Sequence, residues 1–463
     1  MIKLYNTLGR QLKEFKVPSG DKVKLYTCGP TVYDYSHIGN LRAYVFNDTL
    51  RRTLEAGGYE VRHIMNITDV GHLASDEDEG EDKLEKGAGR ENKTVQEVAD
   101  YYIKAFLSDT SALNILRPNA YESADENYAR ATSFIKEQIA IVKILIDKGF
   151  AYASEQAIYF DVTKLADYGK LSGQKLSDKE VAARSEVVTD KNKRNPQDFA
   201  LWFFTVGRFA THSLHWSSPW GEGFPGWHLE CSTIIHSTLG EPIDIHTGGV
   251  DHIGTHHTNE IAQTEAAFGV PLSKIWMHNE HLLVDGQKMS KSLGNYLTMA
   301  DITKKGFAPL ALRLLFLQSH YRSQTNFTWE SLESAASFLK RIEAWSDLLF
   351  QRQPNLSTDR LNDIKAPIFN DLNTPEALAA LSRILSDENS IPDKQIIVEL
   401  DKLFGLGLSR RTDVSDEVKE LISQRDAARA NNSWTEADQI RDKLINNGIE
   451  VSDSASGPIW RRI

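Results

Sequence analysis

Apolar and polar positions in the first part of the chain follow the pattern of alternating strands and helices. The apolar residues of segment 21–26 predict a short buried strand, and segment 41–55 predicts the helix that follows it. A second apolar strand is expected over 60–67. Because strand, loop, helix and strand in this order open an α/β unit, the pattern predicts an α/β fold.

The middle of the chain shows a different pattern. Segment 125–148 has apolar residues at spacings of four, three and four, at Ile135, Ile139, Val142 and Ile146. This period predicts an amphipathic helix, with Gly149 at its end. A β-hairpin is expected over 151–162, and the polar, lysine-rich segment 163–193 is expected to be mostly loop. Together these segments predict a module inserted into the α/β fold.

Strand patterns return over 243–249 and 275–283, which indicates a second α/β half between 198 and 298. From 308 to 404 glycines and strand patterns become rare, and long helical stretches are expected. Near the end of the chain, Ser433 and Glu436 have the spacing of a capping box, followed by one apolar helix face and by Gly448. A small C-terminal domain is therefore expected.

Composition narrows the class of protein. The 463 residues are 41% hydrophobic and 25% charged, which is typical of a globular protein. The formal net charge of −11 argues against a histone-like, non-specific DNA-binding protein. The chain has no apolar run long enough for a membrane span and no secretory leader pattern, so we expect a cytoplasmic protein without a membrane partner. The acidic run 76–82 is expected to be a solvated loop.

Four residues have the chemistry of a metal site. His256 and Glu260 are four apart, so on a helix they share one face. The chain has two cysteines, Cys28 and Cys231, which is too few for a disulfide framework. Two thiolates, an imidazole and a carboxylate would suit Zn²⁺. Spacing alone leaves open the alternative of two buried free cysteines and a surface His/Glu pair.

Two further motifs suit the binding of phosphate groups. Segment 288–292 reads K-M-S-K-S and combines two cations with two hydroxyls, which fits a phosphate clamp, although a solvated basic loop has the same composition. Segment 36–40 reads S-H-I-G-N and lies between the first strand and the first helix. A helix N-terminus there would favour an anion.

In combination, these motifs resemble a known family. H-I-G-N at 37–40 and K-M-S-K-S at 288–292 resemble the two signature sequences of class I aminoacyl-tRNA synthetases. Four other motifs resemble cysteinyl-tRNA synthetases in particular: C-G-P-T-V-Y at 28–33, N-I-T-D at 66–69, P-G-W-H-L-E-C at 225–231 and H-H-T-N-E at 256–260. The resemblance extends over essentially the whole chain.

The resemblance implies a Rossmann-type catalytic domain with a connective insertion, followed by a helical bundle and a small C-terminal anticodon-binding domain. The expected segments are 1–115 and 198–305 for the two catalytic halves, 116–197 for the insertion, 306–410 for the bundle and 411–463 for the anticodon-binding domain.

The resemblance also implies roles for individual residues. One zinc ion per chain is expected to be held by Cys28, Cys231, His256 and Glu260. Contacts to the amino-acid substrate are expected from Gly29, Thr31, Thr68 and Trp227. Contacts to ATP are expected from His37, Asn40, His246, Gly248, Gly249, Asp251 and Lys291. Catalytic charge stabilisation is expected from His37, Asn40, Lys288 and Lys291, and tRNA contacts from Trp434 and Arg441.

The expected function is that of a cysteine–tRNA ligase: a monomer that activates L-cysteine with ATP and Mg²⁺ and charges tRNA(Cys). One alternative is a ligase that passes cysteine to an amino sugar, as in the mycothiol pathway, and another is a non-catalytic, zinc-dependent nucleic-acid-binding protein. Asn40, Phe224 and Thr258 depart from the residues usual at their positions, and we expect neither Phe224 nor Thr258 to bind the metal.

Overall fold

The structure is a computed structural model that describes residues 1–463 except 74–81, 120–127, 174–192, 291–292, 388–389 and 455–456. The chain forms two compact units. Unit 1 comprises residues 1–309, 319–328 and 369–372, and unit 2 comprises 310–318, 329–368 and 373–463.

Unit 1 is built around a parallel sheet of five strands. Their spatial order is β12 (Ser273–Asn279), β11 (Ile243–Gly249), β3 (Val23–Thr27), β4 (Val61–Ile67) and β5 (Ala129–Arg130). In the centre of the sheet, Leu25 of β3 lies opposite Ile245 of β11 and His63 of β4. A parallel sheet of this kind needs cover on both faces, which explains the apolar strands in the sequence.

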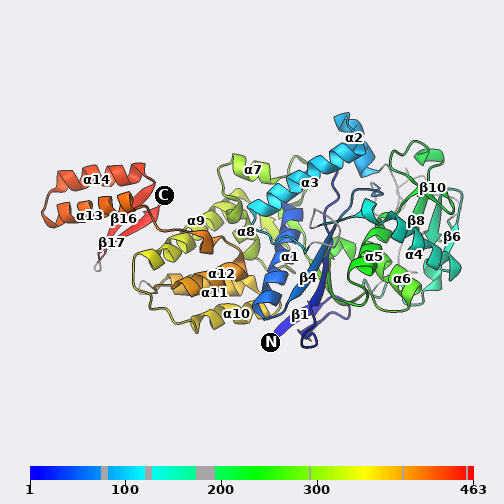
Figure 1. Ribbon diagram of the computed structural model, residues 1–463, viewed down its shortest axis with the longest axis horizontal. Helices are drawn as coiled ribbons and strands as arrows, with labels where there is room; N and C mark the ends of the chain where they lie inside the picture. The colour runs from blue at the N-terminus through cyan, green and yellow to red at the C-terminus, as the bar shows by residue number, and fades with distance from the viewer. Residues whose placement is uncertain (74–81, 120–127, 174–192, 291–292, 388–389, 455–456) are drawn as a thin grey trace. The chain divides into compact units, whose positions relative to one another are not determined.

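Helices pack on both faces of this sheet (Figure 1). They are α1 (Ile38–Ala56), α5 (Trp227–Thr238) and α6 (His256–Phe268). Successive side chains of a strand point to opposite faces. Leu25 accordingly clusters with Leu50 of α1, whereas Tyr26 clusters with Ile234 of α5. The α/β core predicted from the sequence is confirmed, although α1 begins three residues before the predicted start.

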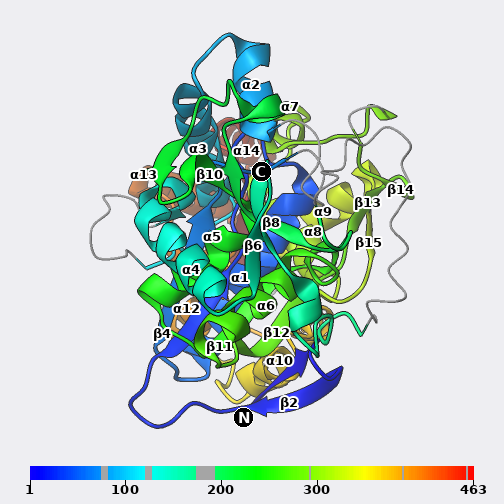
Figure 2. The same cartoon turned by 90° about the vertical axis from the view of Figure 1, so that its right-hand side faces the viewer.

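A second sheet of unit 1 is antiparallel and faces the viewer in Figure 2. Its order is β6 (Ala151–Ala153), β7 (Ala157–Phe160), β8 (Phe199–Phe204), β10 (Gly221–Pro225) and β9 (Trp216–Ser218). Strands β6 and β7 are the predicted hairpin. Helix α4 (Ile135–Asp147) packs in the same hydrophobic cluster, and Gly149 after it takes a φ of +77°. Of the predicted loop 163–193, residues 174–192 lie outside the described residues.

One prediction in this part of the chain is wrong about where a helix begins, and another falls mostly outside the described residues. Helix α4 begins at Ile135 and not at Asp125, because Ala129 and Arg130 pair with β4 and residues 131–134 form a 3₁₀ turn. Strand pairing therefore overrides the local helical pattern. Most of the acidic run 76–82 lies outside the described residues, and its last residue, Asp82, caps the N-terminus of α2 (Lys83–Glu91).

Smaller elements complete unit 1. They are the hairpin β1 (Ile2–Asn6) and β2 (Gln11–Phe15), the helices α3 (Val95–Ala112) and α7 (Met299–Lys304), and a sheet of β14 (Gln287–Lys288), β13 (Leu282–Val284) and β15 (Thr325–Phe327). Strand β15 lies within the stretch 308–404 that was expected to be helical. It pairs in parallel with β13, so a tertiary contact again decides its conformation.

Unit 2 is helical and ends in a two-stranded sheet. Its helices are α8 (Pro309–Leu317), α9 (Trp329–Ser346), α10 (Arg360–Phe369), α11 (Thr374–Leu385), α12 (Lys394–Phe404), α13 (Asp416–Ala430) and α14 (Trp434–Asn446). The first residue of α8, Pro309, and the last residue of α10, Phe369, are assigned to unit 1. The final strands are β16 (Ile449–Ser454) and β17 (Gly457–Arg462). Helix α14 matches the predicted tail helix, but the Ser433 side chain makes no capping hydrogen bond. The five segment boundaries stay predictions.

Candidate functional site

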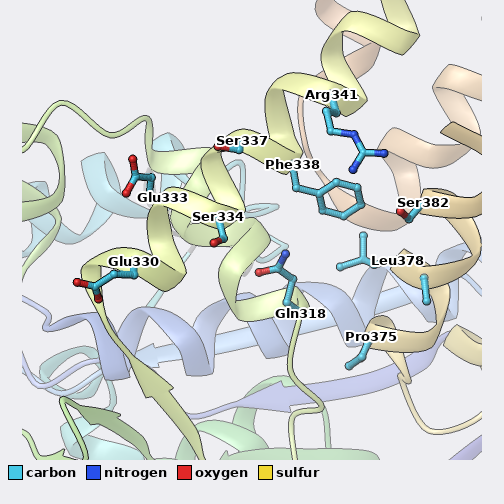
Figure 3. A pocket seen from close by; sticks show the side chains of 11 residues that line it. Gln318, Glu330, Glu333, Ser334, Ser337, Phe338, Arg341, Pro375, Leu378 and Ser382 are labelled. Carbon is cyan, nitrogen blue, oxygen red and sulfur yellow. The ribbon is translucent and has the colours of Figure 1, made fainter. Parts of the chain in front are cut away.

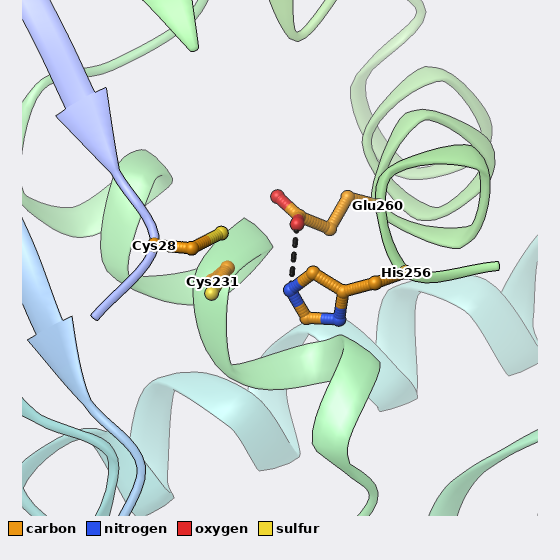
Figure 4. A group of neighbouring side chains, drawn as sticks. All are labelled: Cys28, Cys231, His256 and Glu260. Carbon is orange, nitrogen blue, oxygen red and sulfur yellow. Dashed lines mark ion pairs between the residues drawn. The ribbon is translucent and has the colours of Figure 1, made fainter. Parts of the chain in front are cut away.

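The four predicted metal ligands converge in unit 1 (Figure 4). Cys28 directly follows strand β3, Cys231 lies on α5, and His256 and Glu260 lie one turn apart on α6. One ligand atom from each residue lies within 4.8 Å of the others, and all four side chains are buried. Residues more than 200 positions apart in the sequence are thus brought together, because the end of β3 faces helices α5 and α6.

Other side chains hold two of these ligands in place. His246 Nε2 lies 2.8 Å from Glu260 Oε2, and His228 Nδ1 lies 3.1 Å from His256 Nδ1. Glu260 Oε1 forms an ion pair of 2.8 Å with His256 Nε2. Partners that orient metal ligands in this way are a regular feature of metal sites.

The donor set fits zinc. It offers two sulfurs, one imidazole nitrogen and one carboxylate oxygen, all buried. His257 extends the set, since its Nε2 lies 3.4 Å from Cys28 Sγ, and an overlapping group of Cys28, His246, His257 and Glu260 is equally compact. The sequence prediction missed His257, and its position next to His256 was the available signal.

The protonation states of the cluster are strongly shifted. Burial by itself raises the pKa of the Cys28 thiol, but the hydrogen bond with Cys231 and the nearby histidines lower it well below its usual value. Burial and Cys28 raise the pKa of Cys231. Burial opposes ionisation of His256 and Glu260 as well, yet their mutual attraction raises the pKa of His256 to about 10, and His246 and His256 lower that of Glu260 to about 2. Metal coordination would displace the protons on His256 and Cys231.

A cavity of about 300 Å³ opens beside this cluster. Ten of the residues predicted to act in the site line it: Cys28, Gly29, Thr31, His37, Asn40, Thr68, Trp227, Cys231, Asp251 and His256. The cavity also has lining residues that the sequence prediction missed, including His72, Lys83, His252 and Tyr296. In the sequence, His72 and Lys83 lie on either side of the acidic run 76–82, and no motif or spacing in this segment predicted a role for them.

Three of the predicted glycines are explained by close packing. A Cβ atom on Gly29 would lie 1.8 Å from the Asn66 carbonyl oxygen. On Gly248 it would lie 2.5 Å from the His257 ring, and on Gly249 2.3 Å from the Asp251 carboxylate. These glycines let the backbone approach its neighbours closely at the carboxyl ends of β3 and β11.

The two signature motifs lie next to each other. His37 caps helix α1, and its side chain and that of Asn40 each accept a hydrogen bond from the other residue's backbone N–H. The backbone N–H of Ile38 donates to the Leu297 carbonyl, five residues beyond the second motif, and Tyr296 packs edge-on against the His37 ring. Burial lowers the pKa of His37 to about 4, so the ring is neutral at pH 7.

The remaining predicted residues have different surroundings. His246 is fully buried, does not line the cavity and contacts Glu260. Lys288 lies exposed on β14, and Lys291 lies outside the described residues. In unit 2 the Trp434 side chain is exposed, with the Arg429 guanidinium 5.3 Å from its ring centre, and Arg441 pairs with Asp438.

Two of the three residues that depart from the family pattern, Phe224 and Thr258, have structural roles. Phe224 is fully buried, and its ring stacks on His212 at 3.8 Å. The Thr258 hydroxyl donates to the Ile253 carbonyl at 2.7 Å.

Unit 2 contains a larger hollow of about 750 Å³ between α9 and α11 (Figure 3). None of the predicted site residues that the structure describes lines it. Arg341 lies over the Phe338 ring there, and the carboxylates of Glu330 and Glu333 lie on the other side of the hollow. Its side chains form no group of potential metal ligands, so we place the candidate site at the smaller cavity of unit 1.

No helix among the described residues is long and apolar enough to cross a membrane.

Comparisons with known proteins agree over the whole chain. Residues 14–337 match the family model of the class I (C) tRNA synthetase catalytic domain, and residues 411–461 match that of the cysteinyl-tRNA ligase anticodon-binding domain. The cysteine–tRNA ligase of Treponema denticola is 42% identical, with 100% of both chains covered. That of Chlamydia caviae is 41% identical and covers 100% of this chain and 98% of its own.

Solved structures share the fold at low sequence identity. Mycobacterium tuberculosis methionyl-tRNA synthetase with methionyl-adenylate matches with a TM-score of 0.57 and 14% identity, covering 84% of this chain and 88% of its own. The Agrobacterium radiobacter K84 LeuRS–tRNA–LeuAMS complex matches with a TM-score of 0.60 and 12% identity, covering 85% of each chain. Since both domain models and the full-length relatives agree, the chain belongs to the cysteine–tRNA ligase family of class I aminoacyl-tRNA synthetases.

Proposed function

We propose that the protein activates L-cysteine with ATP, forming cysteinyl-adenylate and pyrophosphate, and then transfers the cysteinyl group to the 3′ end of tRNA(Cys). The observation that carries this proposal is the thiol, imidazole and carboxylate cluster, of which Cys28, Cys231 and His256 line the same cavity as His37 and Asn40 of the first signature motif. A thiol-binding group and a phosphate-binding motif thus share one cavity.

The metal end of the cavity would select the substrate. Cys28, Cys231, His256 and Glu260 would hold a zinc ion, which when bound supplies a soft Lewis acid that prefers a thiolate to a hydroxyl. Gly29, Thr68 and Trp227 line the same cavity and would surround the rest of the amino acid. Discrimination against serine would then arise at binding, without a separate editing site.

The signature motifs would act on the phosphates. In adenylate formation the cysteine carboxylate oxygen bonds to the α-phosphorus of ATP while the bond to the pyrophosphate oxygen breaks. The neutral His37 ring and the Asn40 amide are suited to hydrogen-bond phosphate oxygens, and Lys288 and Lys291 would add positive charge. Mg²⁺ would accompany ATP.

The nucleoside would lie against the loop that follows β11. Gly248, Gly249 and Asp251 are our candidates for contacts to it, and Asp251 lines the cavity. His246 was expected among these contacts, but its buried contact with Glu260 favours a role in orienting that metal ligand.

The C-terminal segment favours tRNA as the acceptor over an amino sugar. A ligase for a small amino-sugar acceptor has no use for an anticodon-binding domain, whereas residues 411–461 match such a domain. A non-catalytic nucleic-acid-binding protein would not need the two signature motifs. Trp434 offers an exposed ring beside Arg429, which suits base stacking, and Arg441 is a candidate for a phosphate contact. The cytoplasmic location and the monomeric state stay predictions.

Amino-acid-dependent ATP–pyrophosphate exchange tests this function. We expect exchange with cysteine and none above background with serine or any other standard amino acid. Charging is then measured with tRNA(Cys) and with a tRNA of another specificity as the control. Exchange driven by another amino acid would refute the substrate, and exchange with cysteine but no charging of tRNA(Cys) would refute the acceptor.

A further inference from the structure

A chain of hydrogen bonds leads from Lys83 to Thr31 along the wall of the cavity. Lys83 Nζ lies 2.6 Å from His72 Nε2, and Thr31 Oγ1 lies 2.6 Å from His72 Nδ1. All three side chains line the cavity that contains the metal ligands. His72 is buried, so its two ring nitrogens are held between these partners.

The chemistry of the three groups fixes the direction of these hydrogen bonds. A lysine ammonium has three N–H donors and no acceptor, so His72 Nε2 must accept from Lys83. The ring nitrogen that accepts carries no proton, and the neutral imidazole therefore carries its proton on Nδ1. His72 Nδ1 then donates to Thr31 Oγ1, which leaves the Thr31 hydroxyl proton to serve as a donor to another group.

The backbone holds His72 and Lys83 in register with each other. The backbone N–H of Lys83 donates to the His72 carbonyl at 2.9 Å, and Leu73 and Asp82 form a β-bridge beside this pair. Asp82 caps α2, and its carboxylate accepts from the N–H groups of Leu84 and Glu85. The Lys83 side chain therefore projects from a fixed helix start.

The His72 ring is also connected to the metal end of the cavity. It stacks on Trp227 with ring centres 4.0 Å apart and planes within 11°. The Trp227 ring stacks in turn on His256 at 4.2 Å. The three rings form a column that ends at a candidate metal ligand, and the Thr31 hydroxyl, which contacts the first ring, lines the same cavity as that ligand.

We propose that Lys83 and His72 are positioning residues that set the Thr31 hydroxyl as a hydrogen-bond donor to the carboxylate of the bound amino acid. This inference rests on the proposed function of the cavity. An O–H donor suits a carboxylate oxygen, whereas the α-ammonium group of the amino acid is itself a donor. With the thiol held at the metal ligands, the carboxylate of so small a substrate must lie in the adjoining part of the cavity.

Two variants of His72 distinguish the effect of the hydrogen-bond chain from the effect of ring stacking, and two others remove its end groups. His72→Phe keeps an aromatic ring against Trp227 but removes both nitrogens, whereas His72→Gln keeps one donor and one acceptor without the ring. Lys83→Met removes the ammonium, and Thr31→Val removes the hydroxyl with little change of shape. The control Lys86→Met removes an exposed ammonium from the same helix. Each purified variant is assayed by ATP–pyrophosphate exchange, and its zinc content and thermal stability are recorded.

We expect His72→Phe, Lys83→Met and Thr31→Val each to raise the KM for cysteine roughly tenfold to a hundredfold, the usual effect of losing a hydrogen bond to a charged group. The KM for ATP, the zinc content and the Lys86→Met variant should be unchanged. His72→Gln should recover part of the loss. Because His72 acts through Thr31, the double variant Thr31→Val/His72→Phe should be no worse than Thr31→Val alone.

Several outcomes would overturn the inference. The first is an unchanged KM for cysteine in Thr31→Val, and the second is a rise in the KM for ATP without a rise in the KM for cysteine. The third is a double variant Thr31→Val/His72→Phe whose KM for cysteine rises by the product of the two single effects. If His72→Phe does not fold, Lys83→Met and Thr31→Val carry the same test. Failure of the proposed function itself would look different, since the unaltered protein would then show no cysteine-dependent exchange.

Discussion

Replacing Gly29 with alanine tests whether the close approach of two backbone segments builds the proposed metal site. Gly29 follows the ligand Cys28, and its N–H donates to Asn66 Oδ1 at 2.8 Å. A Cβ on Gly29 would lie 1.8 Å from the Asn66 carbonyl oxygen, whereas real Cβ contacts essentially never fall below 3.0 Å. The two backbones must therefore separate by more than about 1 Å, since neither contact atom belongs to a flexible side chain.

The expected effect of this shift is large on activity and moderate on stability. A displacement of about 1 Å at a reacting geometry costs on the order of 10² in rate, and overpacking costs about 1–3 kcal/mol of folding free energy. We expect kcat/KM for cysteine in pyrophosphate exchange to fall about 10²-fold and zinc content to drop, since Cys28 moves with its neighbour.

The matched control is Gly89→Ala. A Cβ on Gly89, within helix α2, meets no atom within 4 Å, so this variant should keep full activity. The prediction is refuted if the activity and the zinc content of Gly29→Ala stay within threefold of the unaltered protein. In that case the backbone at Asn66 would move aside without displacing Cys28.

Four further variants, at three positions, test other parts of the protein. Cys231→Ser should lose zinc and raise the KM for cysteine strongly, and full zinc retention on metal analysis would exclude Cys231 as a ligand. His37→Ala should lower exchange by roughly 10²–10³, with little change in cysteine affinity on direct binding measurement; unchanged turnover would remove it from the mechanism. Burial lowers the pKa of His37 to about 4, whereas the pKa of an unfolded histidine is about 6.5. Between these two pH values the unfolded chain binds a proton on His37 that the folded chain does not, so the folded state loses stability as the pH falls. The variant His37→Gln should therefore lose less thermal stability over that range than the unaltered protein does. An equal loss would contradict the shift. Trp434→Ala should reduce tRNA charging roughly tenfold or more without affecting pyrophosphate exchange, as expected for a lost base stack, and equal charging would contradict that role.

Much of the site could be predicted because its motifs carry their chemistry in local order. H-I-G-N at 37–40 lies at a helix start, where His37 and Asn40 cap each other, and His256 and Glu260 share a helix face by their spacing alone. The local sequence could not predict which side chains contact these residues in the folded protein. The contact of His246 with Glu260 and that of His72 with Lys83 arise only when strands and helices pack, so residue spacing could not predict either contact.

The sequence by itself determined the alternation of strands and helices, the residue types of the metal site and the family resemblance, because each depends on residue chemistry or short-range spacing. The tertiary structure decided where pairing overrides local preference, as at Ala129 and Arg130, which join β4 in place of extending a helix, and at Thr325–Phe327, which pairs with β13 inside a helical stretch. It also decided which side chains meet. Cys28 and Cys231 are 203 positions apart, and only the packing of α5 and α6 against the end of β3 places their sulfurs beside one imidazole and one carboxylate, where burial and mutual charge then set their protonation.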